Sequence, residues 1–248
     1  MSGKAKLASL RGRLLDRLSP IYRGKKSLQG VAVRERYESL EQLIDDHFRK
    51  YSDSNHPCRR TFATALEKLG RKPAVIIETG SSAWGTNSSL LFDSYVNSYG
   101  GFFSSVDLRA EPMFTLRSAC THRSEFSCDD SIHFLQQFVS QNTPPALVYL
   151  DSWDVDWANP LASAMHGFYE FLILLPLLRN GSLLLVDDTP LNIDVMRNVQ
   201  PKHVEEFDRF TKAYGFTPGK GTLIKSFLAK HSIGEEIKHD YQLLWEFS

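Results

Sequence analysis

Short apolar runs alternate with longer stretches of helical periodicity over most of the chain. From residue 74 onward, runs rich in β-branched or large apolar residues are followed by apolar positions that recur every three or four residues. Strands buried on both faces and amphipathic helices give these two patterns. The predicted strands cover residues 75–79, 102–107, 125–127, 146–150, 182–186, 222–228 and 241–247.

Helices are predicted between most of these strands. They cover residues 87–99, 113–121, 131–139, 160–179 and 201–214. Strands and helices that alternate in this way predict a parallel sheet with helices on both faces. The expected fold class is therefore α/β, with a doubly wound, seven-stranded, mostly parallel sheet.

The N-terminal part of the chain carries helical patterns only. Residues 35–70 contain two apolar stripes at helical spacing, separated by a polar loop at 52–57, and Gly70 is placed to end the second helix. Residues 1–28 combine leucines at helical spacing with an excess of lysine and arginine. Such a helix packs on its own domain, or binds a membrane surface, a nucleic acid or a partner.

These patterns divide the chain into two predicted parts. We expect residues 1–58 to form a helical N-terminal segment or lid, and residues 59–248 to form the α/β domain. The length of 248 residues suits one such domain with an appended segment, or two small domains.

Composition excludes several classes of protein. A hydrophobic content of 42% with a formal net charge of zero is that of an ordinary globular chain, and it disfavours a general nucleic-acid binder. The three cysteines are widely spaced, which predicts neither a disulfide framework nor a zinc site and favours a reducing compartment.

No segment has the pattern of a membrane span or a secretory signal. The longest apolar candidate, residues 168–178, is interrupted by Glu170, and the basic N-terminus lacks an apolar core followed by a cleavage site. We therefore expect a cytoplasmic protein without a transmembrane segment.

A loop of glycines and small polar residues follows the first predicted strand. Its acid and glycines are spaced as Glu78, Gly80 and Gly85, which differs from the dinucleotide fingerprint G-x-G-x-x-G. Glycine lets a backbone approach a ligand closely, and a carboxylate complements a cationic group. The loop therefore predicts a cofactor site, with a tight strand-to-helix turn that holds no ligand as the alternative.

Acidic residues end four of the predicted strands, at Glu78, Asp107, Asp151 and the pair Asp187 and Asp188. A single acid at such a position is ordinary, because Asp also begins turns and caps helices. Open parallel sheets bind ligands outside the carboxyl ends of their strands. Acids at four strand ends, in register with the strand pattern, therefore predict a ligand site at this edge.

Three of these acids form a candidate metal site. The carboxylates of Asp151, Asp187 and Asp188 would repel one another unless they were protonated or bound to a cation. A set of oxygen ligands suits a hard divalent ion such as Mg²⁺. The alternative is that Asp187 or Asp188 only caps the turn before Pro190.

The Glu-x-Gly loop and the ordered acids that follow it resemble the class I S-adenosylmethionine-dependent methyltransferases. The resemblance implies a Rossmann-like methyltransferase fold, with S-adenosylmethionine as cofactor. It implies that the loop backbone faces the amino-acid end of the cofactor, that Asp107 accepts the ribose hydroxyls, and that Asp130 and Ser131 lie beside the adenine. The implied cofactor residues are Glu78, Thr79, Gly80, Ser81, Ser82, Gly85, Ser88, Asp107, Asp130, Ser131 and Asp151.

The resemblance extends to the metal-dependent O-methyltransferases that act on small molecules and sugars. In that subgroup an acid ends strand four and an Asp-Asp pair ends strand five. This matches Asp151, Asp187 and Asp188 to the metal positions, with Asp151 also catalytic. The resemblance implies methyl transfer to a hydroxyl of a small molecule or saccharide.

The loop after strand four departs from the pattern of this subgroup. The subgroup commonly has Asp-x-Asp, whereas here Asp151 is followed by Asp154 and Asp156, with Trp153 and Trp157 between and after them. The two tryptophans either form a wall for the substrate or cover the edge of the sheet.

His166 is the second candidate catalytic residue, because its side chain titrates near neutral pH and suits a general base. Glu170 follows one helical turn later, and a buried pair of the two is the alternative. Lys220 and Lys225 flank Gly221. Either the segment is a turn into a late strand, or a lysine there meets an anionic substrate.

Two other functions are compatible with the same pattern. One is a modifying enzyme of the hydroxylase type on a methyltransferase fold, and the other is a non-catalytic protein that binds a partner. Nucleic-acid methylation is disfavoured by the neutral charge and by the lack of an Asn/Asp-Pro-Pro-Tyr/Phe motif after strand four. A homo-oligomer is compatible with the sequence.

Overall fold

The computed structural model describes residues 35–81 and 85–248. The basic helix predicted over residues 1–28 lies outside the described residues, and so does Ser82. The division of the chain at residue 58 stays a prediction.

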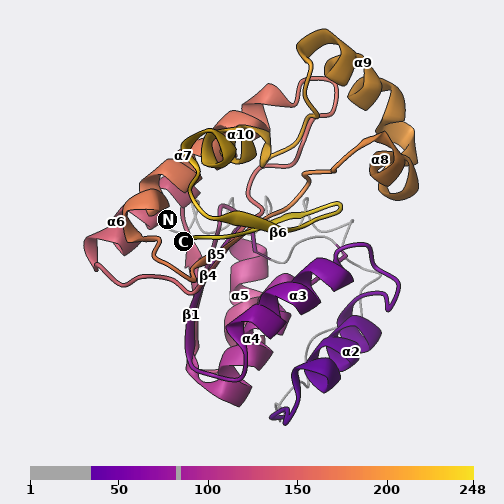
Figure 1. Cartoon of the computed structure of the whole chain (residues 1–248). Coiled ribbons are helices and arrows are strands. Elements are labelled where there is room, and N and C mark those ends of the chain that lie inside the picture. The colour runs from indigo at the N-terminus through magenta and orange to yellow at the C-terminus, as the bar shows by residue number, and fades with distance from the viewer. Residues whose placement is uncertain (1–34, 82–84) are drawn as a thin grey trace, which may run out of the picture. The chain divides into compact units, whose positions relative to one another are not determined.

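A seven-stranded sheet organises the described residues (Figure 1), with strand order β3-β2-β1-β4-β5-β7-β6. Strands β1 to β5 are parallel, and β7 runs antiparallel to both β5 and β6. The predicted doubly wound, mostly parallel sheet is confirmed. The strands are β1 (Ala74–Thr79), β2 (Gly101–Asp107), β3 (Ser124–Cys128), β4 (Leu147–Leu150), β5 (Leu183–Val186), β6 (Glu235–His239) and β7 (Leu243–Glu246).

Helices cover both faces of this sheet and connect its strands (Figure 1). They are α2 (Leu40–Tyr51), α3 (Arg59–Leu69), α4 (Ser88–Tyr99), α5 (Ala110–Ala119), α6 (Ser131–Ser140), α7 (Leu161–Leu174), α8 (Ile193–Val199), α9 (Val204–Tyr214) and α10 (Thr222–His231), with short 3₁₀ turns at Leu175–Leu177 and Pro201–His203. No helix among the described residues is both long and apolar enough to cross a membrane.

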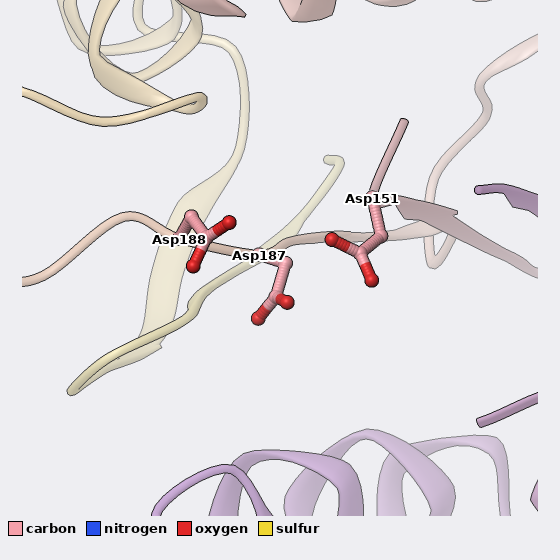
Figure 2. Close-up of side chains that lie close together, drawn as sticks. All are labelled: Asp151, Asp187 and Asp188. Atoms are coloured by element: carbon pink, nitrogen blue, oxygen red, sulfur yellow. The ribbon is translucent and has the colours of Figure 1, made fainter. Parts of the chain in front are cut away.

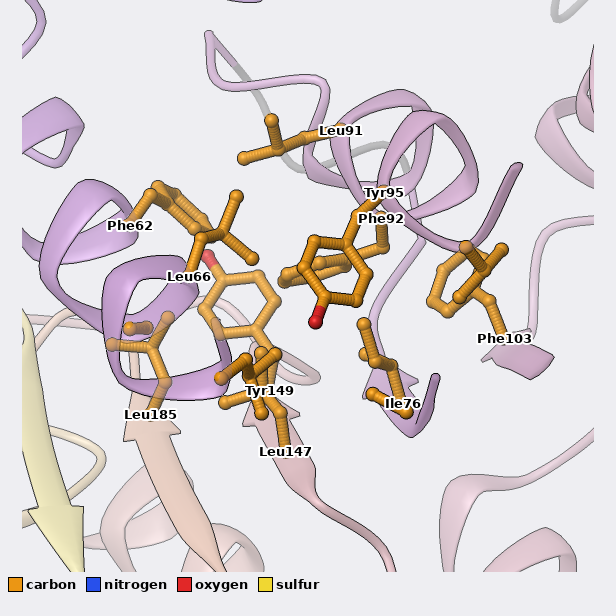
Figure 3. Close-up of a cluster of buried hydrophobic side chains, with 14 of the residues drawn as sticks. Phe62, Leu66, Ile76, Leu91, Phe92, Tyr95, Phe103, Leu147, Tyr149 and Leu185 are labelled. Carbon is orange, nitrogen blue, oxygen red and sulfur yellow. The ribbon is translucent and has the colours of Figure 1, made fainter. Parts of the chain in front are cut away.

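The apolar strands are buried on both faces, as their sequence predicts. Successive side chains of a strand point to opposite faces, so Ile76 and Ile77 of β1 join different cores. Ile76 belongs to an aromatic-rich cluster that Phe62 of α3, Phe92 of α4 and Tyr149 of β4 share (Figure 3). Ile77 packs in the second cluster, with residues of α6, α7 and α10.

The helices predicted over residues 35–70 are confirmed as α2 and α3. The hydroxyl of Ser39 accepts a hydrogen bond from the backbone N–H of Gln42 at 3.1 Å and so caps α2. At the end of α3, Gly70 has a φ of +70° and closes the helix with backbone bonds. Leu43 and Phe62 come from the two stripes and are fully buried.

The strand predicted over residues 222–228 is wrong, because this segment is helix α10. Its β-branched residues suggested a strand, but Ile224 and Leu228 are buried one helical turn apart. The strand that completes the sheet is β6, whose run of charged residues concealed it. Charged side chains are common on edge strands because they discourage pairing with other chains.

Helix α8 was not predicted at all. It is short, and its first turn depends on Asn192, whose side-chain oxygen accepts hydrogen bonds from the N–H groups of Asp194 and Val195 at 3.0 Å. The predicted helix over 160–179 ends earlier than expected, at Leu174, and continues as a 3₁₀ turn that contains Pro176.

Candidate active site at the carboxyl ends of the strands

The registers of the parallel strands bring the predicted acids to one edge of the sheet. Thr79 is paired with Val106 and with Leu150, and Leu150 is paired with Val186. The next residue of each strand is therefore at the same level. Backbone hydrogen bonds of 2.9–3.0 Å join Gly80 to Val106, Asp151 to Thr79 and Asp187 to Leu150. The site residues at the ends of β1, β2, β4 and β5 are thus neighbours.

The loop after β1 requires glycine at its first position. Gly80 has a φ of +81°, and a Cβ atom there would lie 2.3 Å from the carbonyl oxygen of Asp151. A real Cβ atom cannot approach backbone so closely, so Gly80 is needed for β1 and β4 to end side by side. Gly85, with a φ of +88°, closes the same loop beside His56.

Glu78 is fully buried beneath this loop. Its carboxylate accepts hydrogen bonds from the hydroxyls of Ser88 and Ser105 at 2.6 Å and from that of Ser89. Burial raises the pKa of Glu78 to about 7, although the three hydroxyls oppose this shift. The side chain therefore ties β1 to the start of α4 and to β2, and Ser81 joins the same group through Ser105.

Asp107 ends β2 as predicted, and its carboxylate is held by a residue that the sequence analysis did not name. The guanidinium of Arg109 donates to Oδ1 at 2.9 Å and to Oδ2 at 2.6 Å. Arg109 also donates to the carbonyl oxygen of Ser81 at 3.0 Å, across the mouth of the glycine loop. Both oxygens that a ribose would use are thus occupied by an exposed arginine.

The three candidate metal ligands come together as predicted. Asp151, Asp187 and Asp188 each offer one carboxylate oxygen within 4.8 Å of the other two. Figure 2 shows the carboxylate of Asp151 turned towards Asp187, which lies between the other two acids. Burial and the charge of Asp187 raise the pKa of Asp151 well above its ordinary value.

Lys220 is the cation of this acidic cluster. Its ammonium Nζ lies 2.6 Å from Oδ1 of Asp151 and 3.0 Å from Oδ2 of Asp188, and only 2% of its side chain is exposed. Burial alone would lower the pKa of Lys220, but Asp151, Asp188 and Asp187 raise it well above the ordinary value. The ammonium is therefore charged at neutral pH.

A neutral side chain donates to one oxygen of each of the three carboxylates. The hydroxyl of Tyr241 donates to Oδ1 of Asp188 at 2.6 Å, and the side-chain amide of Gln242 donates to Oδ1 of Asp187 at 2.8 Å. The hydroxyl of Tyr149 donates to Oδ2 of Asp151 at 3.3 Å. The set of oxygens suits Mg²⁺, but each carboxylate already accepts from a protein side chain, and an ammonium is paired with two of the three.

A second polar network gathers around Glu170 of α7, which is almost fully buried. Its carboxylate accepts hydrogen bonds from Ser152 at 2.6 Å and from Thr79 at 3.3 Å, and it lies 3.4 Å from Nε2 of His166. The same nitrogen lies 3.0 Å from the hydroxyl of Ser131. The structure thus brings His166 into direct contact with Ser131 and links it to Thr79 through Glu170.

The contact with Glu170 raises the pKa of His166, although burial opposes the shift. The pairing of His166 with Glu170, which the sequence leaves open as an alternative, is present in the structure. The role of His166 as a general base stays a prediction.

The remaining sequence candidates have structural partners. Asp130 caps α6, with its side chain accepting from Ile132 and His133. Trp157 is buried and packs against Phe207. Trp153 has 59% of its surface exposed and lies beside His166, with ring centroids 5.2 Å apart.

Sequence reasoning gave Lys220 no place in the acidic cluster and did not name Tyr241, Gln242 or Arg109. A buried acidic cluster requires a counter-charge. The spacing of residues in the sequence does not identify Lys220 as that charge, because two helices, α8 and α9, separate it from Asp188. Arg109 could have been identified from the sequence, because it lies only two residues after Asp107.

No protein-family model and no curated protein sequence matches the chain. Several solved structures resemble the chain. The methyltransferase MycE from the mycinamycin biosynthetic pathway, in complex with Mg and SAH, matches with a TM-score of 0.57 and 16% identity over 87% of this chain and 56% of that chain. Its complex with Mg, SAH and mycinamycin VI matches with a TM-score of 0.56 and 15% identity over the same shares.

The match to an O-methyltransferase from Bacillus cereus in complex with SAH covers 94% of this chain and 96% of that chain, with 15% identity and a TM-score of 0.47. This chain spans little more than half the length of MycE. The strand order with an antiparallel β7, together with the likeness to MycE, establishes the architecture. The chain has the Rossmann-like fold of the class I S-adenosylmethionine-dependent methyltransferases.

Proposed function

We propose that the chain is a methyltransferase that moves a methyl group from S-adenosylmethionine to a hydroxyl of a small molecule or saccharide. The observation that carries the proposal is the alignment of Gly80, Asp107, Asp151 and Asp187 at one edge of a methyltransferase-type sheet. MycE supports it, because its complexes contain SAH and, in one of them, mycinamycin VI.

The cofactor half of the proposed site lies at the ends of β1 and β2. The backbone of the loop that begins at Gly80 is proposed to face the amino-acid end of the cofactor, and Asp107 to accept the ribose hydroxyls. Arg109 is bonded to both oxygens of Asp107, so the ribose hydroxyls would take the place of the arginine at this carboxylate. Asp130 and Ser131 are proposed to border the adenine.

Glu78 is proposed to act on the cofactor through the loop. Its carboxylate is enclosed by three serine hydroxyls, so it fixes the position of Ser88 at the start of α4 and of the loop backbone. The cofactor role of Ser82 stays a prediction.

The acceptor half of the proposed site is the acidic cluster. The bound cofactor would supply a methyl carbon on a sulfonium, which passes to the acceptor oxygen while the C–S bond breaks and a neutral thioether leaves. The chain must hold the hydroxyl oxygen in line and take its proton. Asp151 is proposed to take that proton, since a carboxylate with a raised pKa is a stronger base once it is ionised.

Mg²⁺ at Asp151, Asp187 and Asp188 stays a prediction. The Mg in the MycE complexes supports it. The ion pairs of Lys220 with two of the three carboxylates oppose it.

The proposal is tested by release of S-adenosylhomocysteine from the full chain in the presence of sugars and other hydroxylated acceptors. Asp188→Asn should reduce turnover by roughly 100-fold or more while the affinity for S-adenosylhomocysteine stays within about threefold. The control is Asp194→Asn on α8, an exposed acid paired with Arg197. A wild-type chain that binds the cofactor and methylates no hydroxyl, or an unaffected Asp188→Asn variant, would contradict the proposal.

A further inference from the structure

We infer that Lys220 takes the place of a divalent cation in the acidic cluster, so that this site holds no Mg²⁺ and works without it. The inference deepens the proposed function, on which it rests, because it identifies the cation at the proposed acceptor site.

Groups of the protein itself surround the ammonium of Lys220. It donates hydrogen bonds to Oδ1 of Asp151 at 2.6 Å and to the carbonyl oxygen of Asp151 at 3.3 Å, and it forms an ion pair with Oδ2 of Asp188 at 3.0 Å. These contacts hold the side chain within the protein as a resident cation.

The backbone of Lys220 fixes the residue in this position. Its N–H donates to the carbonyl oxygen of Asp188 at 3.1 Å, and the next residue, Gly221, donates to the hydroxyl of Thr189 at 2.9 Å. A Cβ atom on Gly219 would lie 2.6 Å from the Asp188 carbonyl oxygen, so this turn packs directly on the end of β5. The lysine therefore belongs to the same rigid unit as the acid that it pairs with.

A divalent cation bound to these acids would lie close to the ammonium of Lys220. Mg²⁺ binds oxygen at about 2.1 Å, and Nζ lies 2.6 Å from Oδ1 of Asp151. An ion bound to that oxygen would therefore lie within about 5 Å of the ammonium, where like charges in a buried site repel strongly. The other oxygens of Asp151 and Asp188 accept from Tyr149 and Tyr241.

The test is a titration of the full chain with Mn²⁺, a paramagnetic substitute for Mg²⁺. Electron paramagnetic resonance detects free Mn²⁺, and its signal decreases when the ion binds to the protein. The wild-type chain should leave the signal of millimolar Mn²⁺ unchanged. Lys220→Met keeps the length of the side chain and removes its charge, and it should bind one Mn²⁺ at least roughly 100-fold more tightly than the wild type. Uptake of one ion per chain by the wild type would overturn the inference, and so would a folded Lys220→Met variant that takes up none.

A matched control and a second variant keep the test decisive. Lys225 lies on α10, just after the turn that holds Lys220, and pairs with Glu236 at 2.7 Å and not with the three acids, so Lys225→Met should behave as the wild type. Should Lys220→Met fail to fold, Lys220→Arg retains the charge and should still exclude Mn²⁺, and uptake by that variant would overturn the inference.

A parallel measurement separates this inference from the proposed function. Methyl transfer by the wild type should be unchanged by EDTA, and its loss would count against Lys220 as the resident cation. Absence of binding to S-adenosylhomocysteine in calorimetry would instead defeat the proposed function, and the Mn²⁺ titration would still report on the cation of the cluster.

Discussion

Replacement of Gly80 by alanine tests how tightly the glycine loop and the end of β4 are packed. Two separate effects lower the free energy of unfolding of this variant. Alanine is strained at a φ of +81°, which destabilises the fold by about 1–2 kcal/mol. In addition, the new Cβ atom would lie 2.3 Å from the carbonyl oxygen of Asp151, and overpacking of this kind adds about 1–3 kcal/mol.

Gly181 provides a control that isolates the second term. It has a φ of +83°, and a Cβ atom there would meet nothing within 4 Å. Gly181→Ala should therefore lose only the strain term of about 1–2 kcal/mol. The neighbouring backbone of Asp151 cannot retreat to relieve Gly80→Ala, because its N–H is bonded to the carbonyl oxygen of Thr79 at 2.9 Å.

The assay is urea unfolding followed by circular dichroism, with the free energy of unfolding extrapolated to water. We expect Gly80→Ala to be less stable than Gly181→Ala by about 1–3 kcal/mol. Calorimetry should show that Gly80→Ala has also lost affinity for S-adenosylhomocysteine, whereas Gly181→Ala has not. Equal stability of the two variants would refute the packing argument.

Two further predictions concern the residues around the same loop. The pKa of Glu78 is raised from 4.5 to about 7, so its contribution to stability is fully present below pH 4.5 and is lost as pH rises through 7. The free energy of unfolding of the wild type should therefore fall by about 3 kcal/mol relative to Glu78→Gln across this range, and parallel urea profiles would count against the burial argument. Arg109 occupies both oxygens of Asp107, so Arg109→Ala should bind S-adenosylhomocysteine up to about fivefold more tightly, and calorimetry that showed weaker binding would assign Arg109 to the cofactor site.

The sheet and its acidic edge could be predicted because local sequence determines both. Strands such as 75–79 are buried on both faces and therefore read as continuous apolar runs. Parallel pairing then aligns their ends, so Asp151 and Asp187 had to become neighbours once the strands were recognised. Element order alone was enough to place these acids together.

The counter-charges could not be predicted because tertiary packing supplies them. Lys220 reaches Asp151 from a turn before α10, and this helix was mistaken for a strand because Thr222 and Ile224 are β-branched. The charged edge strand Glu235–His239 was missed for the converse reason, since its pairing with β7 outweighs its weak local preference. Sequence located the carboxylates, and the three-dimensional structure identified what neutralises them.

Calorimetry with S-adenosylhomocysteine tests the central claim most directly. The account predicts that the wild-type chain binds one equivalent and that Asp107→Ala, which removes the acceptor of the proposed ribose hydrogen bonds, weakens binding by roughly 10- to 100-fold. Asp194→Ala is the matched control, because Asp194 also pairs with a nearby arginine but lies on α8, outside the proposed site. Absence of binding by the wild type, or equal affinities of the Asp107 and Asp194 variants, would contradict the claim that this edge of the sheet binds a methyl donor.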